Sequence, residues 1–281
     1  MTHSPVLILL AGSLAGLLAG CAGRHGAGAG GPPDALAPPF ARVPFEPISR
    51  QAVVAIALRE WRLFGQPVDD DPPGSRSPPP PELKPEREPG LWQRVGEYWW
   101  LGMDAGSEEA GWTGKTDGQG VVFPAREDGE YAWSAAFVSY VMRIAGAGRR
   151  FPYSEAHSTY IDLAKRQKLG KVSGWLVSAE RVTDYAPHLG DLICYSRTVG
   201  RALTYDDLPA GHYPAHCDIV VGVETGQVTV VGGNVDDAVT LKHVPVGPDG
   251  RLAGPGGQVI DARYPWMTVL RVLFPEGTPL A

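Results

Sequence analysis

Ala132-Trp133-Ser134-Ala135-Ala136-Phe137-Val138-Ser139 is the stretch that decides the fold of this chain. The sequence from 134 to 145 is apolar on nearly every side, and a helix of that composition is buried rather than lying on the surface. Gly146 and Gly148 follow and indicate where the helix ends. A serine before an apolar helix is most often an N-cap, so Ser134 by itself indicates only a helix start.

The sequence on the two sides of this helix differs in periodicity. Before it, apolar residues recur at helical spacing over 48–64 and 91–99, and a further helix is expected over 160–168. After Gly190, β-branched runs predict strands at 191–195, 217–224, 227–231, 239–244 and 268–274. Helices followed by strands favour an α+β domain.

Charge and composition exclude several classes of function. The net charge is −6 and no Lys/Arg cluster is present, which argues against nucleic acid as a partner. Neither a P-loop nor a Gly-x-Ser-x-Gly motif occurs, so an NTPase or a lipase is not indicated, and no cofactor is expected. Tryptophans are concentrated between residues 61 and 133, where we expect a packed aromatic core rather than a sugar-binding surface.

The N-terminus has the pattern of a targeting signal. Residues 6–19 are apolar and small, too few to span a bilayer comfortably, and suit the core of a signal peptide ending at residue 20. Leu18-Ala19-Gly20-Cys21 resembles the bacterial lipobox, which implies that Cys21 is lipidated. The Gly/Ala/Pro-rich sequence of 21–39 is typical of a tether. The alternative is a cytoplasmic protein with an apolar start.

A lipid anchor would be the only membrane contact of this chain. No Asp follows Cys21, so in a cell with two membranes we expect an outer-membrane lipoprotein that faces the periplasm.

Two further cysteines remain, Cys194 and Cys217. An even pair in an oxidising compartment favours a disulfide between them. Two separate buried thiols are one alternative. A zinc site that adds His212 and His216 is another, but no Cys-x-x-Cys or His-Glu-x-x-His element supports a metal, and none is expected.

Three segments downstream of the helix carry a resemblance to a known family. They are Gly190-Asp191-Leu192-Ile193, His216-Cys217-Asp218-Ile219-Val220-Val221 and Gly232-Gly233-Asn234. With the helix, they resemble in order the nucleophile motif, the Gly-Asp-Leu strand, the histidine strand and the polar third position of the NlpC-type and CHAP (cysteine, histidine-dependent amidohydrolase/peptidase) families. The resemblance covers about residues 131–244, and serine stands where that family carries its cysteine.

The resemblance implies a papain-like α+β domain over 131–281, with the buried nucleophile helix packed on an antiparallel sheet. The helices of 40–130, with a Pro-rich loop, look like an extension carried by a bacterial group of unknown function that has serine at this position. Cys194 and Cys217 would then lie on neighbouring strands.

The same resemblance implies a Ser-His-Asn site. A helix N-terminus favours an anion and activates a thiol, but a serine hydroxyl also needs a base. His216 is the candidate base, and Asn234 would orient its imidazole. His157, Trp133 and Asp218 are candidates for lining the same cleft. The alternatives are that His157 caps the helix over 160–168 and that Asp218 is a solvated residue at a strand end.

Three hypotheses about function follow. The first is an envelope-anchored amidase or peptidase that acts on peptidoglycan peptides with Ser134 as nucleophile. The second is a catalytically inactive papain-like module that binds a cell-wall peptide or a protein partner in the old cleft. The third is a structural lipoprotein whose cleft has no role.

Overall fold

A computed structural model describes residues 47–275 except 76, 78, 81, 82, 104, 105 and 125–129. The predicted signal peptide, the lipobox-like tetrapeptide with Cys21 and the predicted tether lie outside the described residues. The described residues belong to one compact unit, so the helical segment before 131 and the segment after it share one core. None of the helices in this part of the chain combines the length and the apolar character that crossing a bilayer demands.

Four α-helices precede the sheet strands in this part of the chain: α1 (Arg50–Leu63), α2 (Leu91–Gly102), α3 (Ser134–Ile144) and α4 (His157–Lys168). The first begins where the Ser49 side chain accepts a hydrogen bond from the Ala52 backbone N–H, an N-cap contact. The predicted bounds of the first three helices agree with the structure to within two or three residues. The fourth helix starts three residues earlier than expected and so includes His157.

Six strands form one antiparallel sheet in the described residues. They are β1 (Val177–Glu180), β2 (Leu192–Ser196), β3 (Ala215–Glu224), β4 (Gln227–Val235), β5 (Ala238–Pro245) and β6 (Trp266–Val272). Their order in the sheet is β1-β6-β2-β3-β4-β5, and every neighbouring pair is antiparallel. The prediction of an α+β chain is confirmed, with β1 as the strand that the sequence pattern did not indicate.

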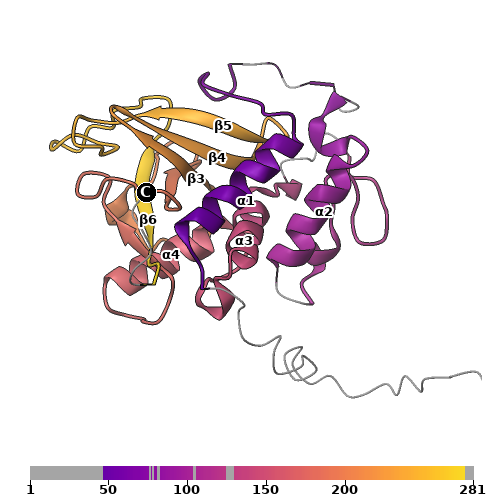
Figure 1. Cartoon of the computed structure of the whole chain (residues 1–281), viewed down its shortest axis with the longest axis horizontal. Helices are drawn as coiled ribbons and strands as arrows, with labels where there is room; N and C mark the ends of the chain where they lie inside the picture. The colour runs from indigo at the N-terminus through magenta and orange to yellow at the C-terminus, as the bar shows by residue number, and fades with distance from the viewer. Residues whose placement is uncertain are drawn as a thin grey trace, which may run out of the picture. The chain divides into compact units, whose positions relative to one another are not determined.

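The central helix α3 is buried between α2 and the sheet. Its residues from Ser134 to Met142 are all buried, and it contacts β3 and β4 (Figure 1). Gly233 on β4 permits the approach, because a Cβ at this position would lie 2.5 Å from Phe137 Cβ. The predicted buried helix is therefore confirmed. Because Gly233 has no side chain, α3 can pack closely against β4.

Aromatic side chains of the N-terminal helices fill the space beside α3. Trp133 lies against Phe64 and Tyr98, and Trp99 packs edge-on against Trp112. Trp99 and Trp133 are fully buried. At these positions the prediction of a packed aromatic core is confirmed.

The disulfide between Cys194 and Cys217 is present. The two residues are direct partners in the antiparallel ladder of β2 and β3, with their Cα atoms 4.1 Å apart. The bond removes both thiolates that the zinc alternative required. Among the residues that the structure describes, no group of three or more His, Cys, Asp or Glu side chains could hold a metal ion.

Removing the disulfide should lower stability substantially. The bond closes a loop with a sequence separation of 23, and the chain-entropy model gives about 3 kcal/mol for a loop of this size. We expect Cys194→Ala/Cys217→Ala to lose that amount in urea unfolding. Wild type with reductant should approach the variant and serves as its control. Equal midpoints for variant and oxidised wild type, or two alkylatable thiols in the purified protein, would contradict the prediction.

Candidate functional site

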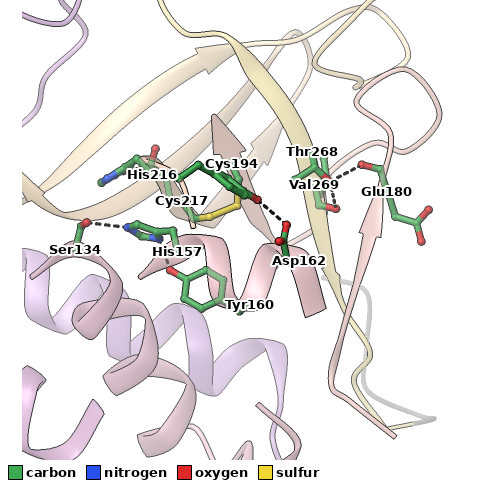
Figure 2. Close-up of a disulfide and its surroundings, with 12 residues drawn as sticks. Ser134, His157, Tyr160, Asp162, Glu180, Cys194, His216, Cys217, Thr268 and Val269 are labelled. Carbon is green, nitrogen blue, oxygen red and sulfur yellow. Dashed lines mark hydrogen bonds and ion pairs between the residues drawn. A yellow bond between two sulfur atoms is a disulfide. The ribbon is translucent and has the colours of Figure 1, made fainter. Parts of the chain in front are cut away.

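Ser134 is the first residue of α3, and its hydroxyl contacts a histidine. Its Oγ lies 2.7 Å from Nε2 of His157, the first residue of α4 (Figure 2). Both residues are only 5% exposed. The N-cap of α3 is Trp133, and no side chain caps this helix end, so the simple interpretation of Ser134 as an N-cap is wrong.

The loop between α3 and α4 is held so that the two residues meet. Ser139, in the middle of α3, donates its hydroxyl to the Ser154 carbonyl and accepts the Ser154 backbone N–H. The Ser154 hydroxyl in turn accepts the Ala156 backbone N–H just before α4. These bonds fix the start of α4 against α3 and thereby place His157 at Ser134.

The second ring nitrogen of His157 has its own partner. Nδ1 contacts the hydroxyl of Tyr160, which lies three residues along α4 and is fully buried. Burial lowers the pKa of His157 well below its ordinary value, and the neighbouring His216 lowers it further. Burial raises the pKa of Tyr160 well above its ordinary value, and Asp218 adds to this. At neutral pH the pair is therefore a neutral imidazole and a neutral phenol.

A second polar cluster begins on β3, where His216 and Asp218 point to the same face because side chains alternate along a strand. His216 Nε2 lies 3.0 Å from Asp218 Oδ1, and Lys242 Nζ, from β5, lies 2.7 Å from Asp218 Oδ2. All three side chains are almost completely buried. The ammonium group of Lys242 also lies over the rings of Tyr195 and Tyr264, at 5.6 and 4.9 Å from their centroids.

Gly232 makes room for this cluster. It lies on β4, between the strands that carry Asp218 and Lys242. A Cβ at this position would lie 2.0 Å from Asp218 Oδ1 and 3.0 Å from His216 Nε2. The first glycine of the Gly-Gly-Asn motif, Gly232, thus leaves room for the contact between His216 and Asp218. The second, Gly233, leaves room for the packing of α3 against β4.

The charges of the second cluster are fixed by its partners. Burial alone would raise the pKa of Asp218, but the Lys242 ammonium and then His216 outweigh it and hold this pKa well below its ordinary value. Burial lowers the pKa of His216, although Asp218 opposes the shift. At neutral pH the cluster is a carboxylate paired with an ammonium and a neutral imidazole.

The two clusters meet at the histidines. The ring centroids of His157 and His216 are 5.2 Å apart, so the imidazole that contacts Ser134 packs against a second neutral imidazole. Within the described part of the chain, the hydrogen bond of Ser134 is to His157 and not to His216. Figure 2 shows Ser134, His157 and His216 together beside the disulfide.

A family model described as "Uncharacterized protein conserved in bacteria (DUF2272)" matches residues 86–272. The chain belongs to this family. The matched range contains both clusters and begins within the helical segment that precedes α3. No curated protein and no solved structure matches the chain.

In this DUF2272 chain, two other predicted site residues do not have the roles expected of them. Asn234 lies in the irregular end of β4 with a left-handed backbone (φ 55°), a conformation that asparagine tolerates well. No hydrogen bond joins it to His216 in the described residues, and Asp218 occupies that position instead. The Trp133 indole donates to Glu86 Oε2 at 2.6 Å and is buried in the core.

Two members of the site were not predicted. Tyr160 follows His157 at a spacing of three, which places both on one helix face, but this signal needs a helix that already starts at 157. Lys242 is a lone cation inside a β-branched run, which is a weak signal by itself. Its pairing with Asp218 depends on the order of three strands in the sheet, and the sequence pattern does not predict that order.

Proposed function

We propose that this chain is a papain-like hydrolase of amide bonds in peptidoglycan stem peptides, with Ser134 as nucleophile and His216 as general base. One observation carries the chemistry: the Ser134 hydroxyl, at the N-terminus of a buried helix, is held 2.7 Å from His157 Nε2, and the His157 ring packs against the proposed base His216 with centroids 5.2 Å apart. The papain-like fold and the substrate class rest on the resemblance of the four sequence segments.

The proposed reaction is acyl transfer through serine. Ser134 Oγ forms a bond to the peptide carbonyl carbon while its proton passes to His216 Nδ1. The carbonyl oxygen becomes an oxyanion, which backbone N–H groups at the start of α3 can stabilise. The C–N bond then breaks, and the amine leaves with the proton from His216. Water attacks the acyl ester by the same route in reverse and releases the acid and Ser134.

His216 is oriented for this role by Asp218 rather than by Asn234, because Asp218 is the residue in contact with its Nε2. The step requires the Ser134 proton to point at His216 Nδ1 in the substrate complex. Hydrogen bonds of this kind are often looser in the free enzyme than in the complex.

Digestion of purified peptidoglycan by the full-length chain in detergent tests the proposal. We expect new amine and carboxyl ends on stem peptides, read by mass spectrometry of the released fragments. Because burial lowers the His216 pKa, the base stays unprotonated below the ordinary value of about 6.5, and the rate should fall only at more acidic pH. Stem peptides that remain intact under all these conditions would count against the proposal.

A second candidate is an inactive module that binds a cell-wall peptide or a protein partner. The burial of the site favours it: Ser134, His157 and His216 are at most 5% exposed, which leaves a substrate carbonyl little access. Under this alternative, the chain sediments with peptidoglycan or retains a stem peptide but leaves every amide bond intact.

We further propose that Cys21 carries a lipid that anchors the chain to the outer membrane, facing the periplasm. The apolar run and the lipobox-like tetrapeptide support this. Cys21→Ser should then prevent incorporation of radiolabelled palmitate. Unchanged labelling of the variant would count against the anchor.

A further inference from the structure

We propose that the two histidines have opposite hydrogen-bonding roles at Ser134: His157 donates a hydrogen bond to the Ser134 oxygen, whereas His216 keeps a free ring nitrogen that can accept the Ser134 proton. This assigns His157 as a second group in contact with the reacting oxygen, with Tyr160 as its positioning residue. The catalytic meaning rests on the proposed function, but the hydrogen-bonding roles can be measured without any activity.

The role of His216 follows from Asp218 and Lys242. The ammonium of Lys242, 2.7 Å from Asp218 Oδ2, keeps the carboxyl ionised, and a carboxylate can only accept hydrogen bonds. The 3.0 Å contact between His216 Nε2 and Asp218 Oδ1 therefore needs the proton on Nε2. A neutral imidazole carries one N–H, so Nδ1 of His216 holds the free lone pair.

The role of His157 follows from Tyr160. The Tyr160 hydroxyl is fully buried, and among the described residues its hydrogen-bond partner is His157 Nδ1. If the hydroxyl accepted a hydrogen bond from an Nδ1–H, its own hydrogen would be buried without a partner, which folded proteins avoid. The hydroxyl therefore donates to Nδ1, and the single N–H of neutral His157 is on Nε2, aimed at Ser134 Oγ.

The two roles complement each other at one oxygen. Ser134 Oγ receives a hydrogen bond from His157, so its own proton is free to be directed at His216. When that proton leaves, negative charge develops on Oγ, and the His157 N–H is already in place to stabilise it. His157 would be unable to act as the base, because its lone pair is occupied by Tyr160.

Long-range ¹H–¹⁵N correlation spectra of the histidine side chains test the assignment. The full-length chain, labelled with ¹⁵N-histidine and kept in detergent, is used at neutral pH. His157→Gln and His216→Gln identify the two signal sets by their loss. We expect both rings in wild type to be neutral and protonated on Nε2. A proton on Nδ1 of either ring overturns the proposal.

Tyr160→Phe adds a test of the positioning role. It removes the donor to Nδ1, so His157 should no longer be held solely as the Nε2–H tautomer, while His216 stays unchanged. Tyr195→Phe is the matched control, because it removes a phenol hydroxyl from a ring that packs against His216, with centroids 5.3 Å apart, and leaves the Tyr160 hydroxyl in place. An unchanged His157 tautomer in folded Tyr160→Phe overturns the role of Tyr160.

The outcome is separable from that of the digestion experiment. If both rings have the expected tautomers but no stem peptide is cleaved, the hydrolase proposal fails and the hydrogen-bonding roles stand. If stem peptides are cleaved but His157 carries its proton on Nδ1, the hydrolase proposal stands and His157 becomes a second base.

Discussion

Ser134→Ala is expected to abolish the proposed hydrolysis of peptidoglycan stem peptides, with a loss of at least about 10³-fold, because Ser134 is the group that would form the acyl ester. The fold should survive. The variant loses one hydrogen bond and leaves the buried His157 N–H without its partner, which costs about 1–3 kcal/mol. Fragment release and urea unfolding of the same preparation measure both effects.

Ser134→Cys tests whether the groups around position 134 are still arranged to activate a nucleophile. A thiol at the N-terminus of α3, beside a base, should have a lowered pKa and react quickly with iodoacetamide. It should also gain or raise hydrolysis. Ser178→Cys is the matched control, since Ser178 is a similarly buried serine on β1 whose hydroxyl contacts Glu180 rather than a histidine.

Either of two results would contradict the role of Ser134. Ser134→Ala could digest peptidoglycan as well as wild type does, in which case the nucleophile lies elsewhere. Alternatively, Ser134→Cys could be inactive with a thiol that titrates near the unperturbed value of about 8.5, in which case the site lacks the environment of a nucleophile.

Lys242→Met is expected to lower the free energy of unfolding by about 3–5 kcal/mol, because it leaves the fully buried Asp218 without its cation. Methionine approximates the shape of the lysine stem, so loss of charge dominates over loss of packing. Urea unfolding followed by circular dichroism measures the change.

Two further variants make the result specific to the buried pair. Lys168→Met removes a cation from a partly exposed pair with Glu180 and should cost at most about 1 kcal/mol. Lys242→Met/Asp218→Asn removes the unpaired charge and should be more stable than Lys242→Met. A cost for Lys242→Met no larger than that of Lys168→Met would show that Asp218 does not depend on Lys242.

The sequence predicted those parts of the fold that local patterns encode. The apolar helix, the β-branched strands and the cysteine pair were all evident before the structure. β1 was not predicted, because Val177-Ser178-Ala179-Glu180 contains only one β-branched apolar residue. This strand is buried because it pairs with β6 and packs against α4. The start of α4 was also missed, since Ser158 and Thr159 are weak helix formers.

The site was predictable only in part, and for a related reason. His216 directly precedes the predicted strand 217–224, which contains Asp218; in the structure both lie on β3, where alternation places them on one face. The contact of His157 with Ser134 depends on how the α3–α4 loop is held, which involves hydrogen bonds from Ser139 and Ser154. The ion pair of Asp218 with Lys242 crosses β4 at Gly232, so it depends on the register of three strands together.

The Cys194–Cys217 disulfide has a consequence for precision as well as for stability. A strand that slips by one residue turns all its side chains to the opposite face. Cys217 lies between His216 and Asp218, and its covalent bond to β2 permits one alignment of β3. The crosslink therefore fixes the face of β3 on which the His216 imidazole and the Asp218 carboxylate lie. A shift of one residue at this point would turn both side chains away from the site.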